Sequence, residues 1–559
     1  MRRMSFLIGI LFMLMLVSVA HAQEQETYYQ LDPNPYDPKV DPDYELFVSN
    51  WQESMPRKMF GFVERNILSP ATGDPVKPAA KGAVLTDIKS FSHATLEARL
   101  TSGPTTLKDE QHIYYVDSGQ GTITSKGKTE PLHDGVGVIV PPGVEFTIKN
   151  PGDEPLTMYV IKEPIPEGFK PRQDVLVRDT NLNQIGGTTG HWTHITNGLF
   201  GQKDGMAVVT GMSPVWYDPM TMGQPHSHGG HEEIWFALEG DITVLLGKKV
   251  FKLTPGSAYK IPPDGKTWHS NINASNKPIK MVWFMRNVPG KRFPYADLDS
   301  RPYNPATESD IDMYISGWKE SLPRNTHGSL IERDVLLRCS GDVLHPSTRG
   351  GVLTYMRRFV YATLYAGNET APTRLKGEQE LFYVLSGTGK LNGGGKTFDL
   401  YPGVAFLAPE NLEFTMKNTS NEPMTFYLVV EPTRPNFRPV DHIVWRDENA
   451  EPIHTSTAHW VNNNKWLIKQ EEGLADIELL LTVTVMPNTF AQPHSHGKGV
   501  EEVWAAIDDG TQFLLGKQIR NLPPGTAYMI PPDDRTPHAN FNLTDKPVKL
   551  FYFGRFTDK

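Results

Sequence analysis

The chain has almost no cysteine. Of its 559 residues only Cys339 is a cysteine, so no disulfide can form within it. Stability must therefore come from packed cores, and a chain of this length can bury several. Amphipathic helical patterns are also few, whereas 48 glycines and 46 prolines are spread along the chain. That distribution is typical of many short strands joined by tight turns.

An excess of positive charge is also missing, since 55 lysines and arginines stand against 64 aspartates and glutamates. The formal net charge is −9 at pH 7, and the sequence shows no basic arm or stripe. Nucleic-acid binding needs the opposite sign, so we expect no nucleic-acid partner. The sequence also contains nothing that resembles a Ser–His–Asp set, a P-loop or a dinucleotide-binding fingerprint.

Long apolar runs are confined to the start of the chain. The opening MRRMSFLIGILFMLMLVSVAHAQ begins with basic residues, continues with the apolar run 6–19 and ends in small residues at Ala22. The run is too short for a membrane span, and the pattern predicts a secretory signal peptide over residues 1–22. Its removal takes away two arginines and no acids, which changes the net charge from −9 to −11. We expect an exported protein, periplasmic or extracellular, whose mature chain has no membrane span.

Internal repetition is the strongest signal in the sequence. VSNWQESMPR around Trp51 returns as ISGWKESLPR around Trp318, and EQHIYYVDSGQG returns as EQELFYVLSGTG. The chain is therefore a tandem duplication, with the join near residues 289–305. Within each half, alternating apolar runs followed by glycine turns and proline-rich corners occur twice, which predicts four all-β units. The expected units cover residues 23–165, 166–296, 297–432 and 433–559.

One duplicated segment concentrates histidine and glutamate at the start of an apolar strand. QPHSHGGHEEIWFALEG returns as QPHSHGKGVEEVWAAIDDG, and alternate residues of a strand point the same way, so each HxH pair aims at one face. A glutamate begins the next strand, and a histidine from a later proline corner can close each set. A duplicated polar loop has no reason to preserve three histidines and one carboxylate selectively. The expected metal ligands are His226, His228, Glu233 and His269 in the first half and His494, His496, Glu502 and His538 in the second.

Three imidazoles and one carboxylate suit a borderline divalent metal and leave coordination positions open. The ligand set accepts Mn, Fe, Co, Ni, Cu or Zn, and the sequence does not choose among these transition metals. We expect one ion in unit 166–296 and one in unit 433–559.

The same residues resemble the cupin superfamily. Its first motif, HxH followed by Glu and then Gly, is similar to the segment that holds His226, His228, Glu233 and Gly240. Its second motif, a glycine, a proline corner, His and Asn, is matched by Gly256, Pro263, Gly265, His269 and Asn273. The second half matches with one extra residue before Glu502, and Asn542 follows His538. The resemblance implies an all-β fold of four cupin-type β-barrels (double-stranded β-helix, or jelly roll), arranged as two bicupin halves.

The other two units lack the paired histidines. The positions of the ligands are taken by Thr105, Leu107, His112 and Phe146 in one unit and by Thr373, Leu375, Glu380 and Phe414 in the other. His112 or Glu380 alone cannot hold a metal firmly, so we interpret both as surface or hydrogen-bonded residues. Units 23–165 and 297–432 are expected to be degenerate barrels without a metal.

Neighbours of the ligand glutamates allow two interpretations. Glu232 and Glu501 precede the ligand glutamates, and alternation sends them to the opposite face as solvated or salt-bridged carboxylates. Trp235 and Trp504 follow by two positions, and either line a pocket or pack in the core.

Four further polar residues are candidates for substrate binding. Lys266 and Arg535 occupy the proline corners and could receive a substrate carboxylate, although surface turns favour basic residues in any case. Gln224 and Gln492 precede the HxH pairs and are candidates to hydrogen-bond there. The sequence identifies no catalytic acid or base.

Two functions from different classes fit these observations. In the first, an exported metalloenzyme acts on a small oxygen-rich molecule: a hydroxy acid, a sugar acid or a phenol. The cupin resemblance implies dioxygenation, decarboxylation, isomerisation or elimination and does not choose among them. In the second, the chain is a non-catalytic sugar- or ligand-binding protein with a structural metal. Open coordination positions favour the enzyme, because structural metal sites tend to be closed. The oligomeric state stays open.

Overall fold

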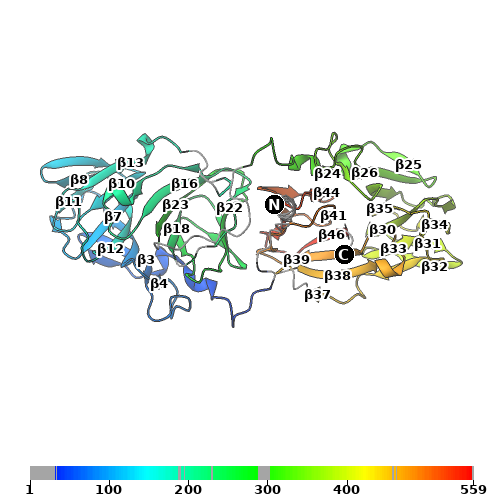
Figure 1. The fold of residues 1–559 in the computed structure, drawn as a ribbon, viewed down its shortest axis with the longest axis horizontal. Helices are drawn as coiled ribbons and strands as arrows, with labels where there is room; N and C mark the ends of the chain where they lie inside the picture. Colours follow the sequence, from blue (N-terminus) through cyan, green and yellow to red (C-terminus); the bar gives the residue numbers. More distant parts are fainter. Residues whose placement is uncertain are drawn as a thin grey trace, which may run out of the picture.

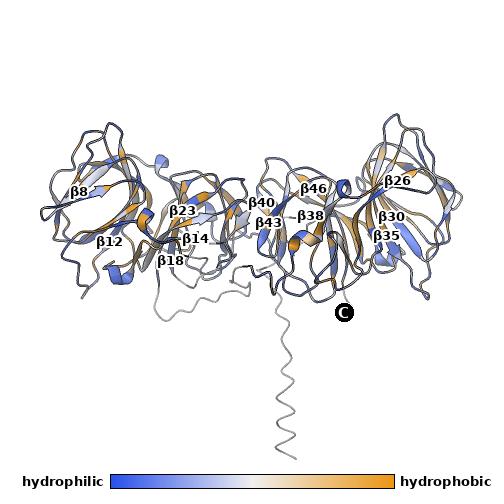
Figure 2. Ribbon diagram, turned by 90° about the horizontal axis from the view of Figure 1, so that it is seen from above, coloured by the Kyte–Doolittle hydropathy of each residue, from blue (hydrophilic) through white to orange (hydrophobic). Residues whose placement is uncertain are grey.

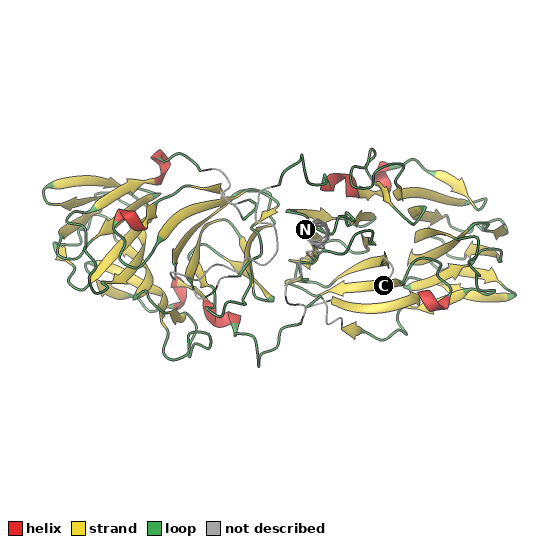
Figure 3. Ribbon diagram, viewed as in Figure 1, coloured by secondary structure: helices red, strands yellow, loops and turns green. Residues whose placement is uncertain are grey.

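The computed structural model describes residues 32, 34–186, 191–193, 195–227, 229, 231–287, 303–455, 459–460 and 462–556. The expected signal peptide and the expected ligand His228 lie outside these residues. The described chain is elongated, with its two halves end to end (Figure 1). Strands make up nearly all of its regular structure (Figure 3). The predicted all-β architecture is confirmed.

The helices of the described residues are short 3-10 turns. They are η1 (Tyr44–Phe47), η2 (Trp51–Glu53), η3 (Thr180–Leu182), η4 (Gln202–Asp204), η5 (Ile311–Tyr314), η6 (Trp318–Glu320) and η7 (Gln470–Glu472). Within the described part of the chain, none is long and apolar enough to cross a membrane.

The first half contains two large and two small sheets. An eight-stranded sheet runs in the order β13 (Leu176–Asp179), β10 (Val136–Val140), β7 (Glu110–Ser118), β12 (Leu156–Pro164), β5 (Ser90–Leu96), β3 (Phe62–Pro70) and β2 (Arg57–Met59), with β4 (Ala83–Leu85) beside β3. It shares a core with the four-stranded sheet β6 (Thr105–Thr106), β11 (Glu145–Lys149), β8 (Gly121–Ser125) and β9 (Lys128–Leu132). A seven-stranded sheet has the order β1 (Val48–Asn50), β21 (Ser257–Lys260), β18 (Glu232–Glu239), β23 (Ile279–Arg286), β16 (Gly211–Tyr217) and β14 (Ile195–Thr196), with β15 (Phe200–Gly201) beside β16. Its smaller companion is β17 (Thr221–Met222), β22 (His269–Asn273), β19 (Ile242–Leu246) and β20 (Lys249–Leu253).

The second half repeats this arrangement, as the sequence duplication predicts. Its eight-stranded sheet is β25 (Arg324–Thr326), β26 (Leu330–Arg338), β28 (Arg358–Leu364), β35 (Met424–Pro432), β30 (Glu378–Ser386), β33 (Val404–Ala408) and β36 (Val444–Asp447), with β27 (Gly351–Leu353) beside β26. The four-stranded sheet that goes with it is β29 (Thr373–Arg374), β34 (Glu413–Asn418), β31 (Gly389–Gly393) and β32 (Lys396–Leu400). The seven-stranded sheet is β24 (Ile315–Gly317), β44 (Thr526–Met529), β41 (Glu501–Ala506), β46 (Val548–Arg555), β39 (Leu479–Val485), β38 (Asn462–Lys469) and β37 (His454–Thr455). The last four-stranded sheet is β40 (Thr489–Phe490), β45 (His538–Asn542), β42 (Thr511–Leu515) and β43 (Gln518–Leu522).

Each expected unit lends a strand to its neighbour. β1 comes before the eight-stranded sheet of the first half, yet it pairs with β21 of the seven-stranded sheet. β13 lies beyond the expected boundary at residue 165 and pairs back onto β10. In the second half β24 pairs with β44 and β36 with β33 in the same way. The expected unit boundaries therefore cut through shared sheets, and the two units of a half are tied together by backbone hydrogen bonds.

Aromatic side chains join the two large sheets of each half. Phe91 of β5 lies 4.9 Å from Phe236 of β18 and 5.1 Å from Phe284 of β23, measured between ring centroids. In the second half Phe359 of β28 contacts Phe551 of β46 at 5.9 Å. Buried apolar area of this kind is the main stabilising contribution in a chain without disulfides.

The two halves meet through the outer faces of two four-stranded sheets. Met222, Leu245 and Ile272 of the first half form one buried cluster with Phe490, Leu514 and Phe541 of the second. Figure 2 shows β40 and β43 on the side of the second half that faces the first. Each of these small sheets therefore has two buried faces.

Candidate metal centres

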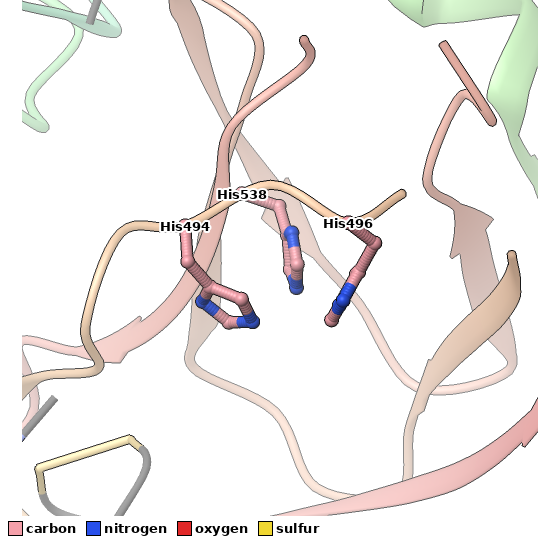
Figure 4. Close-up of side chains that lie close together, drawn as sticks. All are labelled: His494, His496 and His538. Atoms are coloured by element: carbon pink, nitrogen blue, oxygen red, sulfur yellow. The ribbon is translucent and has the colours of Figure 1, made fainter. Parts of the chain in front are cut away.

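The second half brings its predicted ligands together. His494 and His538 pair as neighbouring backbone segments, with N–O distances of 3.2 and 2.9 Å. This pairing sets their side chains on the same side, and His496 follows two residues later. One ring nitrogen from each of the three histidines lies within 4.8 Å of the other two. Figure 4 shows the three imidazoles converging on one space.

Glu502 completes this group from strand β41. Its Oε2 lies 2.6 Å from His496 Nε2, and its Oε1 lies 3.1 Å from His538 Nε2. The indole Nε1 of Trp504 donates to Glu502 Oε1 at 2.5 Å. Trp504 lies two residues further along the same strand, so it points to the same side as Glu502 and holds the carboxylate in place. The predicted ligand glutamate and the predicted histidines thus share one buried cluster.

The tautomer of His494 suits a metal ligand. Its Nδ1 lies 2.9 Å from the carbonyl oxygen of Gln492 and can only donate to it, which leaves the lone pair on Nε2. Among the described residues no side chain or backbone group hydrogen-bonds to that Nε2. Burial, helped by the neighbouring histidines, holds the pKa of His494 well below its ordinary value. A neutral imidazole with a buried, free lone pair is what a divalent metal binds.

Glu502 stays ionised in spite of its burial. Burial alone would raise the pKa of Glu502, but the charges and hydrogen bonds of His496 and His538 outweigh it and hold that pKa well below its ordinary value. An anionic oxygen donor and three nitrogen donors therefore face a common space, and a divalent transition metal fits this donor set.

The first half shows the same arrangement as far as it is described. His226 and His269 pair through backbone N–O distances of 3.2 and 2.9 Å, and their ring centroids lie 4.2 Å apart. Glu233 Oε1 lies 3.5 Å from His269 Nε2 and accepts from Trp235 Nε1 at 2.6 Å. Three of the four predicted ligands of this half are therefore neighbours, and the fourth, His228, lies outside the described residues.

Sequence reasoning missed one histidine beside each cluster. The His191 ring stacks on that of His226 with centroids 4.2 Å apart, and His459 lies 4.5 Å from His494. Burial lowers the pKa of His459 to about 4. The signal was present in the sequence, because the dipeptide His-Trp occurs as GHW around His191 and again as AHW around His459.

A cavity opens beside the second cluster. It has a volume of about 350 Å³, and both His496 and Glu502 line it. Trp504 lines the same cavity and also donates its hydrogen bond to Glu502. Of its two interpretations, the one that places it at a pocket therefore applies. The cluster of three histidines and Glu502 therefore has space next to it in which a small molecule can bind.

Glu232 and Glu501 face away from the ligands, as expected, but neither is solvated. Both are buried, and the expectation of a solvated carboxylate is wrong. Glu232 accepts hydrogen bonds from the backbone amides of residues 86–88 at 2.6, 3.0 and 3.2 Å. Glu501 accepts from the amides of residues 354–356 in the same way. Each carboxylate anchors a loop of the neighbouring unit, which one-dimensional patterns do not show.

His112 and Glu380, at the ligand positions of the other two units, are buried and hydrogen-bonded. A surface position is thereby excluded for both. His112 bonds to Tyr114 at 2.9 Å and to Glu110 at 2.8 Å. Glu380 bonds to the ring of His327 at 3.0 Å. Both residues take part in polar networks inside their sheets.

The network around Glu380 also includes Glu332, and its geometry resembles an ion site. Glu332, His327 and Glu380 each offer one atom within 4.8 Å of the others. Glu332, however, accepts hydrogen bonds from Arg324 at 3.0 Å and from Arg358 at 2.5 Å. These guanidinium groups already neutralise the carboxylate that an ion would use. The absence of a metal from this unit stays a prediction.

The four candidates for substrate binding differ in position. Gln224 and Gln492 are fully buried, and their backbone carbonyls accept from the first histidine of each HxH pair. Lys266 is exposed, and the side chain of Arg535 is 77% exposed with its Nε 3.6 Å from Asp534. The substrate-binding role of all four stays a prediction.

A family model described as the cupin domain matches residues 93–162, 215–285 and 360–430. These three segments are similar to the cupin domain. The matched segments run from β5 to β12, from β16 to β23 and from β28 to β35. The cupin resemblance is confirmed for these three segments. The fourth barrel, over β39 to β46, stays a prediction from the repeated strand order.

Several solved structures resemble parts of this chain at low sequence identity. A variant of oxalate decarboxylase from Bacillus subtilis is 10% identical with a TM-score of 0.34, over 43% of this chain and 77% of that chain. Protein Ylba from E. coli is 14% identical with a TM-score of 0.33, over 43% and 90%. AerE from Microcystis aeruginosa is 18% identical with a TM-score of 0.33, over 44% and 100%. No curated protein sequence matches the chain.

Proposed function

We propose that this protein is a metal-dependent cupin enzyme that acts on a small oxygen-rich molecule. The observation that carries the proposal is the convergence of three histidines and Glu502 beside a cavity of about 350 Å³. A structural metal needs no adjoining space, whereas a catalytic one needs room for a substrate. The substrate class is a hydroxy acid, a sugar acid or a phenol. The reaction is dioxygenation, decarboxylation, isomerisation or elimination.

A divalent metal bound here would polarise the oxygen atoms of such a substrate. The chain's own residues would prepare the site for it. The carbonyl of Gln492 fixes the tautomer of His494, and Trp504 orients Glu502. Burial of all these groups keeps bulk water away from the polar cluster and strengthens each electrostatic interaction within it.

The first half favours the alternative function for its own site, that of a structural metal. The ring of Trp283 on β23 comes within 3.2 Å of where a Cβ on Gly211 of β16 would stand. β16 is the counterpart of β39 in the second half. The indole of Trp283 therefore fills the space beside β16 at this point. We propose that the metal of the first half stabilises its unit and that turnover belongs to the second half.

We also propose that the protein is exported to the periplasm or beyond. The charged and apolar opening of the sequence supports this. Detection of the mature protein in the exported fraction, with its first residue determined by mass spectrometry, tests this proposal.

The test of the enzymatic proposal is metal-dependent turnover. The purified full chain is incubated with representative hydroxy acids, sugar acids and phenols, before and after removal of metal by a chelator. We expect consumption of at least one class, its loss on chelation with the fold retained by circular dichroism, and its return when metal is restored. Unfolding on chelation, with no consumption by the loaded protein, would assign both metals a structural role.

A further inference from the structure

We infer that the second-half site takes a planar aromatic ring that bears an oxygen donor, so that of the three substrate classes it is a phenol. This inference rests on the proposed function and specifies its substrate. It comes from the walls of the cavity beside Glu502.

One wall of the cavity is a row of apolar side chains. Leu479, Leu481 and Val483 are alternate residues of β39, so their side chains leave the strand on the same side, and all three line the cavity. A sugar acid carries hydroxyl groups along its whole length, and a short hydroxy acid has little apolar surface. Against this wall those hydroxyl groups would lose water without gaining a partner, which disfavours binding. An aromatic ring loses nothing of that kind.

Aromatic side chains continue this wall on the neighbouring strands β46 and β41 of the same sheet. Trp504 and Tyr552 lie 4.7 Å apart, measured between ring centroids, with their planes at 63°. This edge-to-face corner offers one ring face and one ring edge to a flat guest, which are the two contacts that aromatic rings prefer. Trp466 also lines the cavity. Its ring stacks on that of His454, with centroids 4.2 Å apart and planes at 16°, and the ammonium of Lys469 lies 5.1 Å from the ring centroid of Trp466. The walls are therefore positioned before any ligand binds.

Polar atoms at the metal end can receive the oxygen of the guest. His496 and Glu502 line this end, and a phenolic hydroxyl can donate to the carboxylate of Glu502 while its ring contacts the apolar wall. Asn464 pairs with Val483 and lines the far end of the cavity.

The charge of the outer residues opposes a substrate with carboxylates. Lys469, Glu471 and Glu478 line the cavity, and the side chains of Lys469 and Glu471 are 42% and 72% exposed. Lys469 pairs with Glu471 at 4.0 Å, so Glu478 leaves the entrance with a net negative charge, which disfavours an anionic guest there. A neutral phenol is not repelled.

The first half has different residues at the same places. β16 carries Gly211 and Ser213 where β39 carries Leu479 and Leu481, and Ser213 pairs with Trp283 as Leu481 pairs with Tyr552. The row of apolar side chains and the pair Trp504 and Tyr552 beside the cavity therefore belong to the second half, although both halves have the predicted metal ligands.

The test compares a flat ring with a puckered ring of the same size. The full chain, loaded with metal, is titrated with 4-methylphenol, with 4-methylcyclohexanol and with gluconate, and each dissociation constant is measured by calorimetry. We expect 4-methylphenol to bind at least tenfold more tightly than the other two. Equal binding of the two rings, or tighter binding of gluconate, overturns the inference. Either result leaves the enzymatic proposal standing if chelation still abolishes turnover of another substrate.

Two variants locate the binding. Tyr552→Trp introduces the residue of the first half and should weaken 4-methylphenol binding at least tenfold with metal content unchanged. Leu481→Ala should have the same effect, because it removes one side chain of the apolar row. Ser213→Ala, at the matching place in the first half, is the control and should leave the affinity as it is. Circular dichroism and metal content show that each variant is folded and loaded. Unchanged affinity in both second-half variants places the phenol elsewhere and contradicts the inference.

Discussion

At the residue scale, single polar contacts prepare the two clusters. One backbone carbonyl, that of Gln492, decides which nitrogen of His494 keeps its lone pair, and one indole holds Glu502. The first half repeats both contacts through Gln224 and Trp235. Since the same two contacts support both ligand sets, the duplicated residues act as a unit rather than as isolated ligands.

The charge of the ligand glutamates is expected to matter for metal affinity. Glu233→Gln and Glu502→Gln keep the shape of the side chain and should leave the barrels folded, but a neutral amide loses the anionic donor. We expect each change to weaken metal binding at its own site at least tenfold. Metal titration of the apoprotein measures this. If the double variant retains metal as firmly as the parent chain, neither glutamate is a ligand.

His93 should make the first half sensitive to acid. Its ring stacks on Trp51 with centroids 4.7 Å apart, and burial, with the positive charge of Arg65, lowers the pKa of His93 to about 4. The unfolded chain, with a histidine pKa of about 6.5, binds the proton more tightly, so stability falls as the pH drops from about 6.5 towards 4. At pH 5 the loss is about 2 kcal/mol.

The second half supplies the matched variant for this prediction. Tyr361 stacks on Trp318 at 5.0 Å in place of the histidine. His93→Tyr should therefore remove about 2 kcal/mol of the difference in unfolding free energy between pH 7.5 and pH 5, as measured by urea unfolding. An unchanged difference between the two pH values would show that His93 is not responsible.

At the scale of elements, exchanged strands and buried carboxylates hold the units of a half together. Glu163 at the end of β12 accepts from the backbone amides of residues 207–209, and Glu431 at the end of β35 accepts from those of residues 475–477. Glu232 and Glu501 make the reverse connection. Each half therefore has two carboxylates, one from each unit, that bind a loop of the other unit.

Removing an acceptor oxygen from one of these carboxyl groups should loosen the half. Glu431→Gln replaces one acceptor oxygen by a donor that faces backbone amides, and a buried polar group left without a partner costs about 1–3 kcal/mol. We expect the unfolding midpoint of the second half to fall by at least about 4 °C. Glu154→Gln, at an exposed glutamate, is the control. A midpoint within about 1 °C of the control would mean that the loop is held by apolar packing instead.

The sequence predicted the strands and the clustering of histidine and glutamate because both leave periodic marks. HxH spacing sets His494 and His496 on one side, and duplication made Glu502 and His538 recognisable. The sequence could not show that β1 and β13 pair with strands of the neighbouring unit, because strands of three or four residues are too short for a pattern that identifies their partners. Nor could it show that Glu501 meets amides from a segment about 146 residues away. The position of His459 was within reach, because its His-Trp dipeptide is duplicated.

At the scale of the whole molecule, the duplication has given two like centres in unlike surroundings. The halves meet through their small sheets, where Trp192 and Trp460 join one buried cluster. Each tryptophan follows a histidine that packs on a ligand histidine, so each cluster lies close to the interface between the halves. Among the described residues, each cluster is built from side chains of its own half. We therefore expect the two centres to bind metal independently and to differ in function.

The most direct test of this account is the metal content of the chain. After exhaustive dialysis, mass spectrometry should find about two ions per chain. His226→Ala with His228→Ala should lower this ratio to about one, and the addition of His494→Ala and His496→Ala should bring it close to zero. Four ions in the parent chain, or retention of both ions after the first pair of changes, would contradict the assignment of one centre to each half.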